Sequence, residues 1–154
     1  CKLFYNEYGL ETISLRYFNI FGPRQRADSA YAAVIAAFAD ALSNKKTPII
    51  YGSGDQFRDF TYVDNVVEAN ILAANSDAIL SGQEVNVGCG QKTSINELCS
   101  IICNHAEPER LDSRPGDVFG SLADISRANS LIGYNPNTNL NDGIEKTIDW
   151  YLSN

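Results

Sequence analysis

Residues 48–75, PIIYGSGDQFRDFTYVDNVVEANILAAN, predict a strand, a glycine turn, a second strand and a helix in direct succession. The apolar run at 48–51 favours a short strand, which the turn at 52–55 ends. Residues 57–63 alternate as a half-buried strand does. The helix at 64–75 then opens on an aspartate, which is a good N-cap. Strands that feed directly into helices are typical of α/β proteins.

The same alternation continues on both sides of this stretch. Upstream we expect a strand at 12–18, a loop at 19–29 and a largely buried, alanine-rich helix at 31–42. Downstream we expect a strand at 85–87, a glycine turn at 88–90, and helices at 94–105, 124–132 and 141–152. Ser94 and Glu97 have the spacing of a capping box. The predicted fold class is therefore α/β.

Length, composition and charge indicate one folded domain that we do not expect to bind nucleic acid. The chain has 154 residues, 44% of them hydrophobic and 20% charged, with a formal net charge of −7. An acidic surface does not attract phosphate backbones or anionic membranes. No apolar stretch reaches the ~18 residues that span a bilayer, and no secretory leader is visible. We therefore expect a cytoplasmic protein with no nucleic-acid or membrane partner.

The cysteines favour a structural role over metal binding. They are Cys1, Cys89, Cys99 and Cys103, and the only histidine is His105. Cys99 and Cys103 share one face of a predicted helix. Small thiols on such a face usually pack into a core. We therefore expect no metal site.

The chain begins without methionine, inside what reads as a helix. Residues 2–8 have helical spacing and Gly9 is a good stop. Two turns alone are too short to be stable. We therefore expect these residues to belong to a longer protein.

Three stretches carry polar groups where a strand or turn ends: residues 16–25, 51–60 and 114–117. In α/β sheets, ligands bind outside the carboxyl ends of strands. Arginines flanked by glycine and proline suit phosphate, because a guanidinium donates to two oxygens at once. Each arginine taken singly is better explained as part of a surface salt bridge. The three together favour a phosphate-binding site.

These segments together resemble one family. LRYFNIFGPRQ, AYAAVI, YGSGDQFRDFTYVDNVVEANILA, VNVGCGQKTSINEL and RPGDV stand in the order found in the extended short-chain dehydrogenase/reductases, the NAD-dependent nucleotide-sugar epimerases and dehydratases. The combination of FGPRQ and AYAAVI is most similar to the branch of UDP-N-acetylglucosamine or uronic acid 4-epimerases. The resemblance implies the last part of a Rossmann-like parallel sheet plus the small C-terminal substrate-binding α/β subdomain. Residues 1–154 then form a single incomplete unit.

The resemblance also implies roles for individual residues. Asn19 resembles a contact to the substrate diphosphate or sugar, and Arg58 and Arg114 resemble the arginines on the pyrophosphate. Asp117 resembles the acceptor for the uridine ribose hydroxyls. The sugar and uracil positions are Gln25, Ala33, Val34 and Ile49. The backbone at Tyr17 and Ile20 resembles the edge that holds the nicotinamide of NAD.

Two family motifs are absent from these residues. The fingerprint G-x-x-G-x-x-G does not occur, and no tyrosine stands four positions before a lysine. In the family that tyrosine takes the proton of the sugar 4-hydroxyl while hydride passes to NAD and returns to the other face. We therefore expect a UDP-sugar-binding part that is catalytically incomplete alone.

Two alternatives remain open. The chain could belong to a nucleotide-sugar dehydratase or decarboxylase, or it could be a non-catalytic nucleotide-sugar-binding module. Without the rest of the parallel sheet that the resemblance implies, the strand at 12–18 has a free edge. Free edges invite pairing with other chains. We therefore expect self-association or pairing with an N-terminal NAD-binding half.

Overall fold

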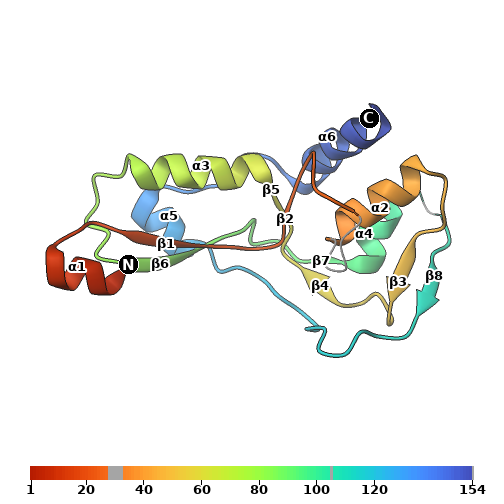
Figure 1. Ribbon diagram of the computed structural model, residues 1–154, viewed down its shortest axis with the longest axis horizontal. Helices are drawn as coiled ribbons and strands as arrows, with labels where there is room; N and C mark the ends of the chain where they lie inside the picture. The colour runs from red at the N-terminus through yellow and green to blue at the C-terminus, as the bar shows by residue number, and fades with distance from the viewer. Residues whose placement is uncertain (28–32, 105, 154) are drawn as a thin grey trace.

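The computed structural model describes residues 1–27, 33–104 and 106–153, and they form an α/β fold with mainly parallel strand pairs (Figure 1). The helices are α1 (Lys2–Tyr8), α2 (Val34–Ser43), α3 (Val63–Ala74), α4 (Ile95–Ile102), α5 (Ser126–Ile132) and α6 (Leu140–Ser153). The strands are β1 (Ile13–Tyr17), β2 (Ile20–Phe21), β3 (Ile49–Tyr51), β4 (Phe57–Arg58), β5 (Thr61–Tyr62), β6 (Gln83–Val87), β7 (Thr93–Ser94) and β8 (Glu109–Leu111).

The first hydrophobic core lies under the longest strand pair. β1 and β6 run parallel, in register from Ile13 opposite Gln83 to Tyr17 opposite Val87. Helices α3 and α5 lie together beside this pair (Figure 1). Tyr134 is fully buried there, and its hydroxyl donates to the carbonyl of Gly88 at 2.9 Å. A buried phenol needs such a partner, and this bond fixes the backbone where β6 ends.

The second core lies between the short strands and three helices. Its buried side chains come from β2, β3, α2, α4 and α6, which are far apart in the sequence; they include Phe21, Phe38, Ile50, Leu98 and Ile144. β3 pairs with β8 and β2 pairs with β5, both in parallel. The segment from β1 to β2 runs from the elements around the first core to those around the second (Figure 1).

The structure confirms most of the predicted elements and their stop signals. The strands near 12–18, 48–51 and 85–87 are present, as are the helices that follow them. Gly9 and Gly133 end α1 and α5 in the left-handed conformation, with φ of 64° and 71°. The Ser94–Glu97 capping box forms in both directions.

The prediction of one strand over 57–63 was wrong. β4 pairs antiparallel with β7, whereas β5 pairs in parallel with β2. The chain changes partner at Asp59 and Phe60, and both side chains are buried. Helix α3 then starts at Val63, with Tyr62 and not Asp64 at its N-cap position.

Other predicted bounds also shift, and several short strands were missed. The predicted loop at 19–29 contains β2. β7 and β8 were not predicted. β7 is too short and β8 too exposed to show the alternation of apolar and polar residues that predicts a strand. Helix α4 ends at Ile102 and α5 starts at Ser126. Part of the predicted helix at 31–42, and His105, lie outside the described residues.

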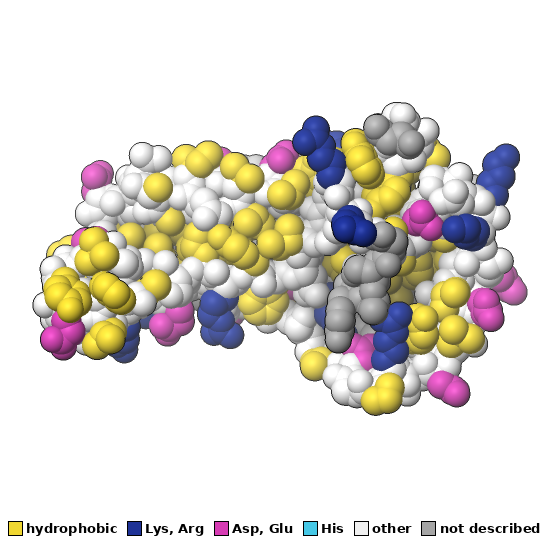
Figure 2. All heavy atoms as spheres, in the orientation of Figure 1, with side chains coloured by type: hydrophobic (Ala, Val, Ile, Leu, Met, Phe, Trp, Pro, Cys, Tyr) yellow, Lys and Arg dark blue, Asp and Glu magenta, His cyan; other side chains and the backbone are white. Residues whose placement is uncertain are grey.

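Apolar side chains gather over α1 and along β1 (Figure 2). Leu3, Phe4, Tyr8 and Leu10 are all more than half exposed. Among the described residues, β1 pairs with β6 alone. These features agree with the expected free edge, while self-association itself stays a prediction. None of the described helices has the length and apolar character needed to cross a membrane.

Two of the four cysteines pack into a core as predicted. Cys99 and Cys103 are buried on the inner face of α4, and the described residues contain no group of side chains suited to a metal ion. Burial raises the pKa of Cys103 to about 12 and the pKa of Cys89 to about 11. Both thiols therefore stay protonated in the folded chain near neutral pH, and a protonated thiol is a poor nucleophile.

The exposure of Cys1 and the raised pKa values of Cys89 and Cys103 predict selective thiol labelling. At pH 8 iodoacetamide is expected to modify exposed Cys1 in the folded protein, while Cys89 and Cys103 react only after unfolding. Raising the pH toward 11 increases the thiolate fraction at Cys89 before that at Cys103. Peptide mass spectrometry of labelled protein measures the order. Rapid labelling of Cys103 at pH 8 without denaturant would contradict the packing of α4.

Candidate functional site: a pocket with two arginines

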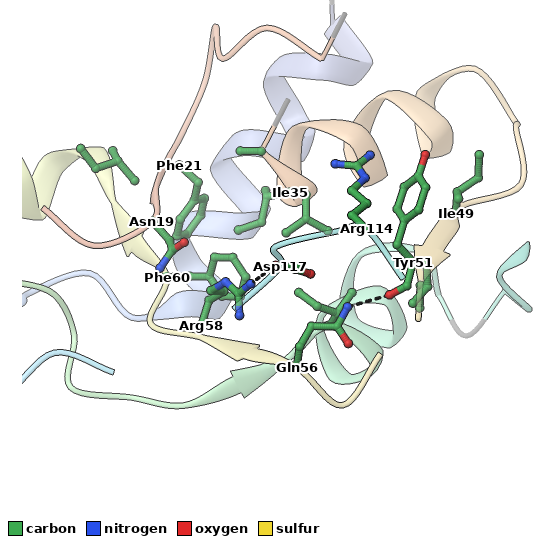
Figure 3. Close-up of a pocket in the computed structure, with 15 residues that line it drawn as sticks. Asn19, Phe21, Ile35, Ile49, Tyr51, Gln56, Arg58, Phe60, Arg114 and Asp117 are labelled. Atoms are coloured by element: carbon green, nitrogen blue, oxygen red, sulfur yellow. Dashed lines mark hydrogen bonds and ion pairs between the residues drawn. The ribbon is translucent and has the colours of Figure 1, made fainter. Parts of the chain in front are cut away.

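A pocket of about 260 Å³ lies between β2, β3 and the first turn of α2 (Figure 3). Its wall is apolar and includes Ile35, Ile50, Phe60 and Ile95. Its polar side chains are Asn19, Gln56, Arg58, Arg114 and Asp117. Apolar walls with a few convergent polar groups are typical of small-molecule sites.

Arg58 lies at the floor of the pocket and is held at both terminal nitrogens. Its Nη1 donates to the carbonyl of Phe57 at 2.8 Å and to that of Phe119 at 3.4 Å. Its Nη2 is 2.5 Å from Oδ1 of Asp117. The Arg58 side chain is only 16% exposed. A guanidinium held this way is preorganised for charge-assisted hydrogen bonds.

Arg114 approaches the same pocket from the loop after β8. Its guanidinium carbon lies 3.8 Å from the centre of the Tyr51 ring, which is a cation–π contact. Gln56 donates from Nε2 to the carbonyl of Tyr51 at 2.7 Å and so fixes the end of β3 (Figure 3). Two cationic groups and one carboxylate therefore face a single pocket.

Asn19 sits at the junction of the two cores. Its φ of 27° lies in the left-handed region, where asparagine is tolerated better than most residues. The backbone carbonyl of Asn19 accepts from the amide of Thr61 at 3.2 Å. Its Nδ2 donates to the carbonyl of Asp59 at 3.2 Å and to Oγ of Ser121 at 3.4 Å. The junction thereby connects β1, β5 and the segment after Phe119.

Asp59 is fully buried beside Arg58, and sequence reasoning gave it no role. Its Oδ1 accepts from the amide of Cys89 at 2.8 Å, and its Oδ2 accepts from the amides of Gly90 at 2.9 Å and Ala123 at 3.1 Å. Backbone donors of this kind stabilise a buried carboxylate. Asp59 therefore joins the end of β6 to residue 123 directly behind the pocket.

The structure brings most of the predicted site residues together. Seven of the predicted substrate positions line the pocket: Asn19, Ala33, Val34, Ile49, Arg58, Arg114 and Asp117. Ile20, predicted from its backbone, also lines it. Tyr51, Gln56 and Phe60 were not singled out, although they flank Arg58 in the sequence.

Two predicted residues lie elsewhere. Gln25 is not among the lining residues, and its Nε2 donates to the carbonyl of Ile20 at 3.1 Å. The carbonyl of Gln25 accepts from the hydroxyl of Tyr151. Tyr17 faces a separate groove beside α3, where its hydroxyl donates to Oδ1 of Asn70 at 3.1 Å.

Each glycine turn has one glycine that neighbouring protein atoms close off. A Cβ on Gly54 would collide with the amide of Asn96. A Cβ on Gly88 would lie 2.5 Å from Cβ of Ala123 and 2.7 Å from Oδ2 of Asp59. The space that a phosphate-binding glycine leaves open is filled by protein at both positions. The backbone at Gly54 and Gly88 therefore leaves no room for a phosphate.

Comparison with known proteins agrees with the resemblance. The pattern of the NAD dependent epimerase/dehydratase family matches residues 1–88. The chain belongs to this family.

Several solved and curated proteins are similar to this chain over nearly its whole length. It is 43% identical to a UDP-N-acetylglucosamine 4-epimerase from Methanobrevibacter ruminantium in complex with UDP-N-acetylmuramic acid, with a TM-score of 0.92 over 99% of this chain and 49% of that one. It is 34% identical to a UDP-glucose 4-epimerase from Thermotoga maritima with UDP-glucose, with a TM-score of 0.88 over 97% and 48%. A putative UDP-glucose 4-epimerase from Methanocaldococcus jannaschii is 38% identical over 99% of this chain and 50% of its own length. The chain thus spans about half the length of the relatives it matches.

Proposed function

We propose that this chain is the UDP-sugar-binding part of an NAD-dependent UDP-sugar 4-epimerase, corresponding to the C-terminal half. The observation that carries the proposal is the convergence of Arg58, Arg114 and Asp117 on one apolar-walled pocket. Solved relatives that hold UDP-sugars match nearly all of this chain. The volume of about 260 Å³ is just below the ~300 Å³ at which ligand pockets usually begin, as suits residues that enclose part of a ligand.

Each part of the ligand contacts pocket residues of matching charge or polarity. Arg58 and Arg114 bind the diphosphate, because each guanidinium can donate to two anionic oxygens. Asp117 accepts from the ribose hydroxyls, since a carboxylate only accepts. Ala33, Val34 and Ile49 pack against the uracil and the sugar, and Asn19 contacts the sugar or the diphosphate.

The contribution to NAD is small in this proposal. NAD supplies the hydride acceptor when it is bound. This chain contributes the backbone edge near Tyr17 and Ile20. The 154 residues contain no tyrosine four positions before a lysine. We therefore expect them to bind ligand without catalysing epimerisation.

Calorimetry with UDP and UDP-N-acetylglucosamine tests the proposal. Saturable binding of both is expected, with uridine bound at least about tenfold more weakly because it lacks the diphosphate. Incubation with NAD and UDP-sugar is expected to give no 4-epimer. If UDP produces no heat at millimolar concentration, the chain is not a UDP-sugar-binding unit.

A further inference from the structure

The orientation of Arg58 depends on a backbone pairing between Phe57 and the segment that follows Asp117. Nη1 of Arg58 donates to the carbonyls of Phe57 and Phe119, and Nη2 pairs with Asp117 (Figure 3). The amide of Phe57 in turn donates to the carbonyl of Phe119 at 2.9 Å. These bonds leave the Nε hydrogen and the second Nη2 hydrogen of Arg58 available to a phosphate. The pairing therefore determines the direction in which Arg58 presents them.

Gly120 lies opposite Phe57 in this pairing, directly against its ring. The two residues form a parallel bridge, and the next amide, that of Ser121, donates to the carbonyl of Phe57 at 3.2 Å. A Cβ on Gly120 would lie 2.2 Å from Cζ and 2.4 Å from Cε1 of Phe57, closer than such atoms approach in folded proteins. Gly120 is not among the glycines with a positive φ. Position 120 therefore requires glycine because of the Phe57 ring and not because of its backbone conformation.

The Phe57 ring is anchored more firmly than the segment that it packs against. β4, which carries Phe57, pairs with β7, and Nζ of Lys92 next to β7 lies 4.5 Å from the centre of the ring. From the segment, Phe119 meets the ring edge-on at 6.0 Å between ring centres, but residues 111–119 are themselves exposed. A side chain at position 120 is therefore expected to push the segment away from β4, while the ring stays in place.

We propose that Gly120 is a positioning residue of the pocket, which keeps Arg58 oriented toward a diphosphate by letting the Phe57 ring pack against the backbone. The role rests on the proposed function. Gly120 does not line the pocket, so it acts through the carbonyls of Phe57 and Phe119, which fix Nη1 of Arg58. Displacing the segment lengthens the bond from Nη1 to Phe119, which is already 3.4 Å. Arg58 then turns its remaining donors away from the phosphate.

The test measures UDP binding by calorimetry for Gly120→Ala, for Phe57→Ala and for the double variant. Gly120→Ala is expected to bind UDP about tenfold more weakly than wild type, the loss that one charge-assisted hydrogen bond gives. In the Phe57→Ala background, the same change at position 120 is expected to cost less than about twofold, because the atoms that it would meet are gone. Residues that act independently would instead give additive losses.

Gly133→Ala is the matched control. Gly133 has a φ of 71°, nothing lies within 4 Å of where its Cβ would be, and it does not line the pocket. The substitution strains the backbone and is expected to lower stability, while UDP affinity stays within about twofold of wild type. Urea unfolding of each variant shows that it is folded where binding is measured. Phe57 and Gly120 belong to neither hydrophobic core, so all variants are expected to fold.

The possible outcomes separate the two proposals. If wild type binds UDP and Gly120→Ala binds it within about twofold, the positioning role is wrong and the proposed function stands. An equal loss from Gly120→Ala with and without the Phe57 ring also overturns the positioning role, as does failure of Gly120→Ala to fold. If wild type does not bind UDP, the proposed function itself fails.

Discussion

Replacing Arg58 with alanine is expected to weaken UDP binding about 100-fold. Arg58 is the more buried arginine of the pocket, at 16% exposure, and its position is fixed by two backbone carbonyls. Charge-assisted hydrogen bonds are worth ~1.5–3 kcal/mol each, so losing those to the diphosphate costs about 100-fold in affinity. The variant also leaves Asp117 without its cation, so a second negative charge faces the incoming ligand. Calorimetry with UDP measures the loss.

Two further variants show whether the geometry or only the charge of Arg58 matters. Arg58→Lys keeps the charge but loses the forked donor geometry, and we expect an intermediate loss of about tenfold. Arg127→Ala removes an exposed arginine that pairs with Glu84 at 3.3 Å and does not line the pocket, and it should bind UDP as wild type does. An affinity within threefold of wild type for Arg58→Ala would remove Arg58 from the proposed site.

The arginine-bearing segments could be predicted because their signal is local. Arg114 stands beside Pro115 and Gly116, and Arg58 follows the glycine turn at 52–54 by four positions; the suitability of arginine for phosphate depends on residue type and backbone access within a few positions. The same holds for the capping box at Ser94 and for the glycine stops at Gly9 and Gly133. These features need no knowledge of what packs against them.

Features that depend on distant partners were missed for a physical reason. Asp59 reads as one polar position of an alternating strand, yet its role is set by amides of residues 89, 90 and 123. β8 is recognisable only from its pairing with β3. Gln25 lies within the resembling motif, and its Nε2 donates to the carbonyl of Ile20, while its role as a substrate contact stays a prediction. Resemblance by position does not determine which neighbour a flexible side chain contacts.

Asp59→Asn is expected to have the largest effect on stability, lowering the free energy of unfolding by about 3 kcal/mol. The carboxylate accepts three backbone amides while fully buried. A carboxamide has one accepting oxygen, so its NH₂ group must face at least one of these donors. A buried donor without an acceptor costs ~1–3 kcal/mol, and the lost charge assistance adds to it. Urea unfolding followed by circular dichroism measures the change in midpoint at constant slope.

Asp77→Asn makes the same change in charge at an exposed position and is expected to shift stability by less than ~0.5 kcal/mol. The comparison decides whether the Asp59 carboxylate stabilises the fold or not. A buried charge is itself costly, so neutralising it could leave the stability unchanged. In Asp59→Asn, the amides of Cys89, Gly90 and Ala123 would lose the carboxylate that accepts from them. These amides fix the backbone behind Asn19 and Arg58. Asp59→Asn should therefore also weaken UDP binding at temperatures where it remains folded. Equal stability of the two variants would mean that this carboxylate does not hold the site together.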